Sequence, residues 1–234
     1  MADRTALRLS ATLLLVGQLL YIVVTLFHTG GEANNHPAIF AAYAASGNWT
    51  VVHAGQFVCM VVFLGGLFAL FFALDAQAEA AIWAARFGAA ATVVTLALYG
   101  VVLTVDGVAL KQAVNAWASA PDAEKAARFA TAESIRWLEW GARSYENFAL
   151  GLAVLLFSVA VLRTAWVPRP IALLMGLAGL TYLAQGWAAG SEGFSPTESL
   201  TIVLDEVLNV AWMTWLLVVA WRMKLPTAAA AVRR

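Results

Sequence analysis

The stretch that decides the fold is "SIRWLEWGARSYENFALGLAVLLFSVAVL", residues 134–162. It contains no proline, so it predicts one continuous helix. The second half is apolar enough for lipid, yet the first half carries Arg136, Glu139, Arg143 and Glu146, separated by three, four and three positions. Side chains at these spacings share one helix face, so the four charges form a stripe of alternating sign about 15 Å long.

Charged side chains inside a membrane normally face a bundle interior or water and pair with one another. The stripe therefore predicts a polar chamber enclosed by several helices. The alternative is a self-paired stripe that only fixes helix packing, since structural ion pairs often resemble functional sites.

Composition supports a membrane protein. The 234 residues are 62% hydrophobic and 12% charged, with a mean hydropathy of +0.78. A soluble domain carries roughly 25% charged residues, so lipid must cover most of this surface. The formal net charge of zero argues against nucleic acid as a partner. The single cysteine, Cys59, excludes an intramolecular disulfide and a CxxC motif.

Six stretches are long and apolar enough to cross the hydrocarbon. They predict an all-α integral membrane protein, a six-transmembrane-helix bundle forming one polytopic domain over residues 1–234. The first stretch follows two arginines, and we expect a retained helix there rather than a cleaved signal peptide. The predicted spans are 5–27, 50–74, 81–108, 132–162, 169–189 and 198–222.

The distribution of basic residues predicts the orientation. With six spans both termini lie on one side, and that side holds nine lysines and arginines against three on the other. The positive-inside rule then places both termini in the cytoplasm, most simply of a bacterial inner membrane. The nine are Arg4, Arg8, Arg86, Arg163, Arg169, Arg222, Lys224, Arg233 and Arg234; the three are Lys111, Lys125 and Arg128.

The longer connections then lie outside, and two of them predict short surface helices. The first lies within residues 36–49, "HPAIFAAYAASGNW". Pro37 suits the first turn of a helix, and Ser46-Gly47 is a signal for its end. Residues 119–130, "SAPDAEKAARFA", suggest a second short helix with Ser119 as its N-cap. Tryptophans near span ends, among them Trp49, are expected to be interfacial anchors.

Other predicted spans repeat the polar spacing in their outer halves, whereas their inner halves are dominated by Leu, Val, Ala and Phe. We therefore expect one shared chamber near the non-cytoplasmic side. The residues expected to carry catalysis are Glu139, Glu146, Arg143 and Asp205. The residues expected to contact substrate are Arg136, Tyr21, Gln56, Tyr99, Asn209 and Trp212.

Two histidines and an aspartate suggest a metal site in this chamber. His28, His53 and Asp106 fall at the outer ends of three predicted spans. Two imidazoles with carboxylates suit Zn, Fe, Mn or Cu, and haem would need the two histidines to face one another. No HxxH or HExxH pair fixes ligands on one helix, so the site depends on convergence of separate helices.

Three functions follow from this pattern. The first is a membrane-embedded metal-binding protein, favoured as an enzyme, that acts on a lipid-like or small substrate reached from the outer leaflet. The second is a proton- or ion-coupled small-molecule transporter that uses the same charge stripe. The third is an accessory or structural subunit. The apolar inner halves favour the first over the second, because a carrier needs a path to both sides. Assembly into a homo-oligomer is compatible with all three.

Overall fold

The computed structural model describes residues 4–32, 34–74 and 79–223, and these residues form helices and no strand. Six helical stretches are long and apolar enough to cross a membrane, which confirms the predicted number of long apolar helices and suggests a membrane protein. They are α1 (Arg4–Thr25), α3 (Trp49–Ala73), α4 with its extension (Glu79–Ala118), α6 (Asp122–Leu162), α7 (Arg169–Glu192) and α8 (Pro196–Arg222). Of the basic residues counted above, Lys224, Arg233 and Arg234 lie outside the described part.

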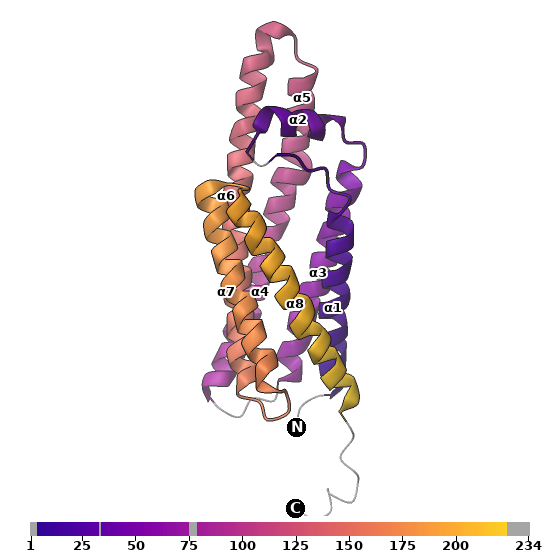
Figure 1. Ribbon diagram of the computed structural model, residues 1–234, viewed down its shortest axis with the longest axis vertical. Helices are drawn as coiled ribbons and strands as arrows, with labels where there is room; N and C mark the ends of the chain where they lie inside the picture. Colours follow the sequence, from indigo (N-terminus) through magenta and orange to yellow (C-terminus); the bar gives the residue numbers. More distant parts are fainter. Residues whose placement is uncertain (1–3, 33, 75–78, 224–234) are drawn as a thin grey trace, which may run out of the picture.

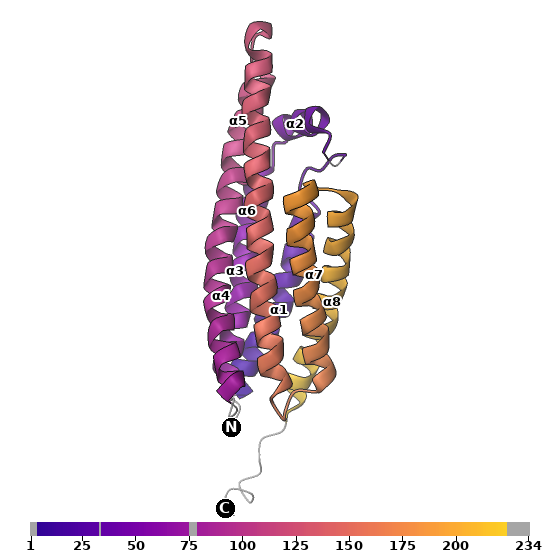
Figure 2. The ribbon, with the colours of Figure 1, turned by 90° about the vertical axis from the view of Figure 1, so that its left-hand side faces the viewer.

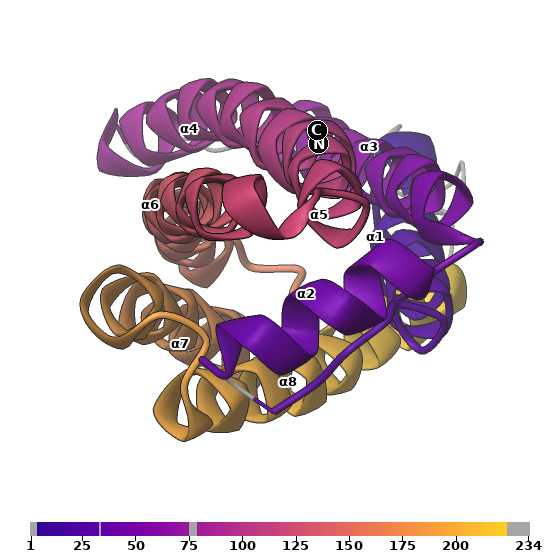
Figure 3. The ribbon, with the colours of Figure 1, turned by 90° about the horizontal axis from the view of Figure 1, so that it is seen from above.

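The six long helices lie side by side (Figures 1 and 2) and form a closed ring, which is seen from above in Figure 3. Each packs on its neighbour in the order α1, α3, α4, α6, α7 and α8, and α8 returns to α1. The ring closes at the end where α1 begins and α8 ends. There the Arg8 guanidinium donates hydrogen bonds to the carbonyls of Ala220 and Trp221, both at 3.2 Å.

The half of the bundle near this closure is a packed apolar core. Because lipid tails are as apolar as leucine, close packing rather than the hydrophobic effect must hold such helices together. At Gly66 of α3, an added Cβ would lie 2.7 Å from the backbone nitrogen of Leu14 in α1, so glycine permits this approach. The core residues are Leu7, Leu14, Leu64, Leu67, Leu70, Phe157, Ile171, Met175 and Leu216.

The charged stretch lies on one helix, as predicted, but that helix is longer than expected. The prediction of a separate short helix after Ser119 is wrong. Residues 122–131 are instead the first turns of the 41-residue α6. Ser119 closes the preceding helix α5 (Lys111–Ala118) by donating to the Asn115 carbonyl, and the N-cap of α6 is Pro121. Two helices thus extend past the bundle as a hairpin, because no helix-breaking residue interrupts α6 between its start and the charged stripe (Figure 2).

The other predicted short helix is confirmed. Helix α2 (His36–Ala45) has proline in its first turn and ends at Ser46, and it lies across the end of the ring (Figure 3). Lys111 fixes its C-terminal end, because the ammonium group donates to the carbonyls of Tyr43, Ala44 and Ser46 at 2.6, 3.1 and 2.9 Å. Cations at a helix C-terminus also complement its dipole.

Trp49 is not an interfacial anchor, contrary to expectation. It is 2% exposed and packs between Tyr43 and His53, with ring centroids 4.3 and 4.5 Å away. Its position at a span boundary is typical of an anchor, but helix α2, which lies across the end of the ring and which we call the α2 roof, encloses it.

Candidate functional site

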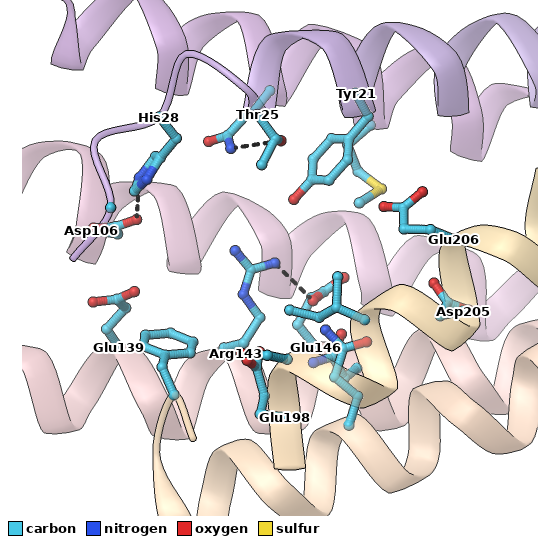
Figure 4. A pocket seen from close by; sticks show the side chains of 18 of the residues that line it. Tyr21, Thr25, His28, Asp106, Glu139, Arg143, Glu146, Glu198, Asp205 and Glu206 are labelled. Atoms are coloured by element: carbon cyan, nitrogen blue, oxygen red, sulfur yellow. Dashed lines mark hydrogen bonds and ion pairs between the residues drawn. The ribbon is translucent and has the colours of Figure 1, made fainter. Parts of the chain in front are cut away.

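A cavity of about 330 Å³ occupies the half of the bundle beneath α2. Its volume is within the range of roughly 300–1,000 Å³ that is usual for small-molecule sites. Residues of α1, α2, α3, η1, α6, α7 and α8 line it. We call it the chamber (Figure 4). Nine of the predicted site residues line it: Tyr21, His28, Gln56, Asp106, Arg136, Glu139, Arg143, Glu146 and Asp205.

 His53 does not line the chamber itself, but it contacts Asp106, which does.

The charged stripe of α6 forms one wall of the chamber. Arg136 donates to Glu139 at 2.6 Å, and the two side chains are only 5% and 2% exposed. One turn further along, Arg143 lies 3.6 Å from Glu146. The stripe therefore pairs along its own helix, as the alternative interpretation required, yet all four side chains also line the chamber. Pairing lowers the cost of burying these charges without removing them from the cavity surface.

The predicted metal residues converge at the α2 end of the chamber. Asp106 Oδ2 lies 2.9 Å from His53 Nε2 and 3.9 Å from His28 Nε2. One ligand atom from each residue lies within 4.8 Å of the others. Two imidazoles and a carboxylate at this spacing are a donor set suited to a transition-metal ion.

A backbone contact orients His53 toward this cluster. Its Nδ1 lies 2.7 Å from the carbonyl of Trp49, an acceptor, so Nδ1 carries a proton and donates. Nε2 then faces Asp106, also an acceptor, and needs either a second proton or a cation between them. Metal-ligating histidines characteristically donate their other ring nitrogen to such a carbonyl. Asp106 Oδ1 is buried with no hydrogen-bond partner among the described residues.

Asp106 owes its position to an irregular turn. It lies in η1 (Thr104–Leu110), a π-helical segment between α4 and α5. Such segments are rare and are frequent at functional sites, because the wider turn redirects a side chain. The next residue, Gly107, packs directly on His53: an added Cβ would lie 3.0 Å from His53 Cβ.

Three predicted substrate residues lie behind the chamber wall. Tyr99 is fully buried beneath Arg143, whose guanidinium carbon is 5.7 Å from its ring centroid. Trp212 donates to Asn209 at 2.8 Å, and Asn209 donates to Asp205 at 3.0 Å. These side chains therefore support residues of the lining rather than forming it.

The α2 roof and the start of α8 supply residues that the predicted site omitted. Tyr43 lines the chamber, and burial raises the pKa of its phenol to about 12, so it stays a hydrogen-bond donor at neutral pH. Glu198 and Glu206 share the polar face of α8 with Asp205. This helical spacing is the sequence signal that could have identified them as site residues. Tyr43 shares the apolar face of the predicted short helix, so no sequence pattern indicated that it belongs to a site.

The fold and the chamber together define a helical bundle with a buried, predominantly acidic site: six carboxylates and two guanidiniums line it. No known family model matches the chain, and no similar protein was found among curated proteins or solved structures.

Proposed function

We propose that this protein is an integral membrane metalloenzyme that hydrolyses a small or lipid-like substrate in the chamber. The observation that carries the proposal is the convergence of His28, from the connection after α1, His53 of α3 and Asp106 of η1 at one end of the cavity. A metal ion held there would supply Lewis-acid activation of water or of a substrate carbonyl. Zn²⁺ and Fe²⁺ suit this donor set best.

Haem is a poorer candidate than a bare ion. The rings of His28 and His53 are in edge contact, with centroids 5.0 Å apart. A porphyrin between two axial histidines would have to separate rings that here touch one another.

The neighbouring side chains have the chemistry that hydrolysis needs. Glu139 points toward the His28–Asp106 end of the chamber (Figure 4), where its carboxylate could take a proton from water and pass it to the leaving group. Arg136 holds one Glu139 oxygen and leaves the other for this exchange. The Tyr43 hydroxyl and the Arg136 guanidinium would stabilise negative charge on a carbonyl oxygen.

We place the protein in a plasma membrane, specifically a bacterial inner membrane, with both termini in the cytoplasm. The excess of basic residues on the terminal side supports this orientation. The chamber then opens in the outer leaflet, and the apolar core lies toward the cytoplasm.

Metal analysis of the purified protein tests the proposal. We expect about one Zn or Fe per chain in the wild type, lost in His53→Ala and Asp106→Asn. Gly107→Ala should weaken metal affinity by roughly 10–100-fold, because its added methyl group lies 3.0 Å from His53 Cβ and would displace that ligand. Gly100→Ala is the matched control in α4, since nothing lies within 4 Å of its added Cβ. Wild-type protein that binds neither ion after supplementation would contradict the proposal.

A second candidate is a cation or proton carrier, and the six chamber carboxylates favour it. It requires an aqueous path through the apolar core. Uptake of a cationic solute by liposomes containing metal-free protein would support this candidate over the enzyme.

A further inference from the structure

The charges of the chamber are unevenly paired. On the α6 side each guanidinium has a carboxylate partner, and Asp106 has two imidazoles. On the α8 side Glu198, Asp205 and Glu206 line the chamber, and among the described residues no lysine, arginine or histidine nitrogen lies within ion-pair distance of them. We call these three residues the α8 carboxylates.

The hydrogen bonds found for this wall come from neutral groups. Asp205 accepts from Asn209 at 3.0 Å and from Thr181 at 3.3 Å. Glu206 accepts from Gln18 of α1. Uncharged donors do not balance the charge of an ionised carboxylate, so a cationic ligand would stabilise the ionised form of this wall.

The facing wall also has polar atoms without hydrogen-bond partners. Glu146 forms an ion pair with Arg143 at 3.6 Å, which is longer than a hydrogen bond. Both carboxylate oxygens of Glu146 and the side-chain oxygen of Gln185 are buried with no hydrogen-bond partner among the described residues. Glu146 is 1% exposed and Gln185 8% exposed, and both line the chamber. Buried polar groups are normally satisfied, so these acceptors point to a ligand that donates hydrogen bonds.

The chamber reaches the outside of the bundle between α1 and α8. Thr25 of α1 and Ser199 of α8 are exposed and also line the cavity, so they mark its mouth. Figure 1 shows α8 crossing the bundle obliquely and diverging from α1 toward this end. Side chains beside the mouth are apolar and exposed: Leu26 by 78%, Leu200 by 59% and Val203 by 59%. A mouth flanked by such residues suits access from lipid rather than from water.

The deep end of the chamber is apolar. Met60, Phe63 and Leu150 belong to the apolar core and also contribute to the chamber lining. A ligand that fits must therefore combine a charged, donor-rich group with a hydrocarbon portion.

From these features we infer that the chamber binds amphiphiles with a primary ammonium group, held by the α8 carboxylates, which enter between α1 and α8. The inference rests on the proposed function and names its substrate class: a lipid that bears a primary ammonium group and a bond that water can cleave. An ammonium group presents three donors and one positive charge, which complements this wall.

Binding of matched eight-carbon probes tests the inference with the full chain in nanodiscs. We expect octylammonium to bind at least about tenfold more tightly than octanol or octyl phosphate, and methylammonium to bind more weakly than octylammonium. The difference in affinity between octylammonium and methylammonium distinguishes an amphiphilic ligand from a free small amine. Equal affinity for octylammonium and octanol, or tighter binding of octyl phosphate, would overturn the inference.

Isosteric variants locate the site. Glu198→Gln and Asp205→Asn should each weaken octylammonium binding by roughly tenfold, whereas Glu124→Gln, on the exposed hairpin, should leave it unchanged. If Asp205→Asn does not fold, Glu198→Gln decides the matter, because wild-type affinity in that variant would contradict the inference.

Metal content separates this inference from the proposed function. His53→Ala, whose side chain lies behind Asp106, should lose metal and keep its selectivity for octylammonium. Normal metal content without ammonium selectivity overturns only the inference. Ammonium selectivity in a protein that never binds metal overturns only the proposed function.

Discussion

The two halves of the helical ring use the same helices for opposite purposes. Beneath α2 the helices enclose the chamber, with six carboxylates, two guanidiniums and His28 on its surface. Toward the ends where α1 begins and α8 ends, the same helices pack leucine, phenylalanine and glycine into a core. One half therefore holds charges that lipid would exclude, and the other holds the helices at close distance.

This difference explains how the chamber is tolerated. Buried ionisable groups cost folding energy unless they pair, and the polar half keeps several atoms unpaired. The close contacts of the apolar half must offset that cost. A bundle closed by packing at one end and open at the other favours the proposed enzyme over the carrier.

The buried ion pair of α6 should show the largest effect on stability. Arg136→Ala leaves Glu139 buried without its partner, which should lower the free energy of unfolding by about 3–5 kcal/mol. Denaturant titration in a mild detergent measures this loss.

The same helix contains a matched control. Arg128 and Glu124 form an exposed pair at 3.0 Å, with side chains 52% and 53% exposed. Arg128→Ala should cost at most about 1 kcal/mol. Similar losses in the two variants would mean that the Arg136–Glu139 pair is not buried, and the distinction between the two halves would fail.

A smaller effect is expected in the apolar half. Gly66→Ala places a methyl group 2.7 Å from the Leu14 backbone and should force α1 and α3 apart, at a cost of about 1–3 kcal/mol. Its neighbour Gly65 has nothing within 4 Å of an added Cβ, so Gly65→Ala should be neutral or slightly stabilising. If both substitutions have the same effect on the melting temperature, helix contact does not depend on Gly66.

Much of this architecture could be predicted from the sequence. Apolar length gave the six spans, and the three-four-three spacing placed Arg136, Glu139, Arg143 and Glu146 on one wall. The concentration of polar residues in one half of each predicted span predicted where separate helices would meet. These signals are local or periodic, so one chain is enough to detect them.

Other features depend on tertiary contacts that periodicity does not encode. The α2 roof brings Tyr43 over the chamber and buries Trp49, although neither residue carries a polar pattern. The π-helical turn that directs Asp106 toward His53 has no sequence signature. The sequence also did not show that the helix beginning at Asp122 continues without a break into the charged stretch of α6. Tyr99, Asn209 and Trp212 shared the predicted polar faces, but depth within the packing placed them behind the wall.

The boundary between the two halves can be measured directly along α6. In a Cys59→Ala background, single cysteines replace Asn147 and Leu150, which line the chamber, and Val154 and Phe157, which lie in the core. The reaction rate with a small, water-soluble thiol reagent is then followed in intact protein. We predict reaction at 147 and 150 and a steep fall at 154 and 157. Comparable rates at all four positions would reveal water throughout the bundle and contradict a chamber closed by an apolar core.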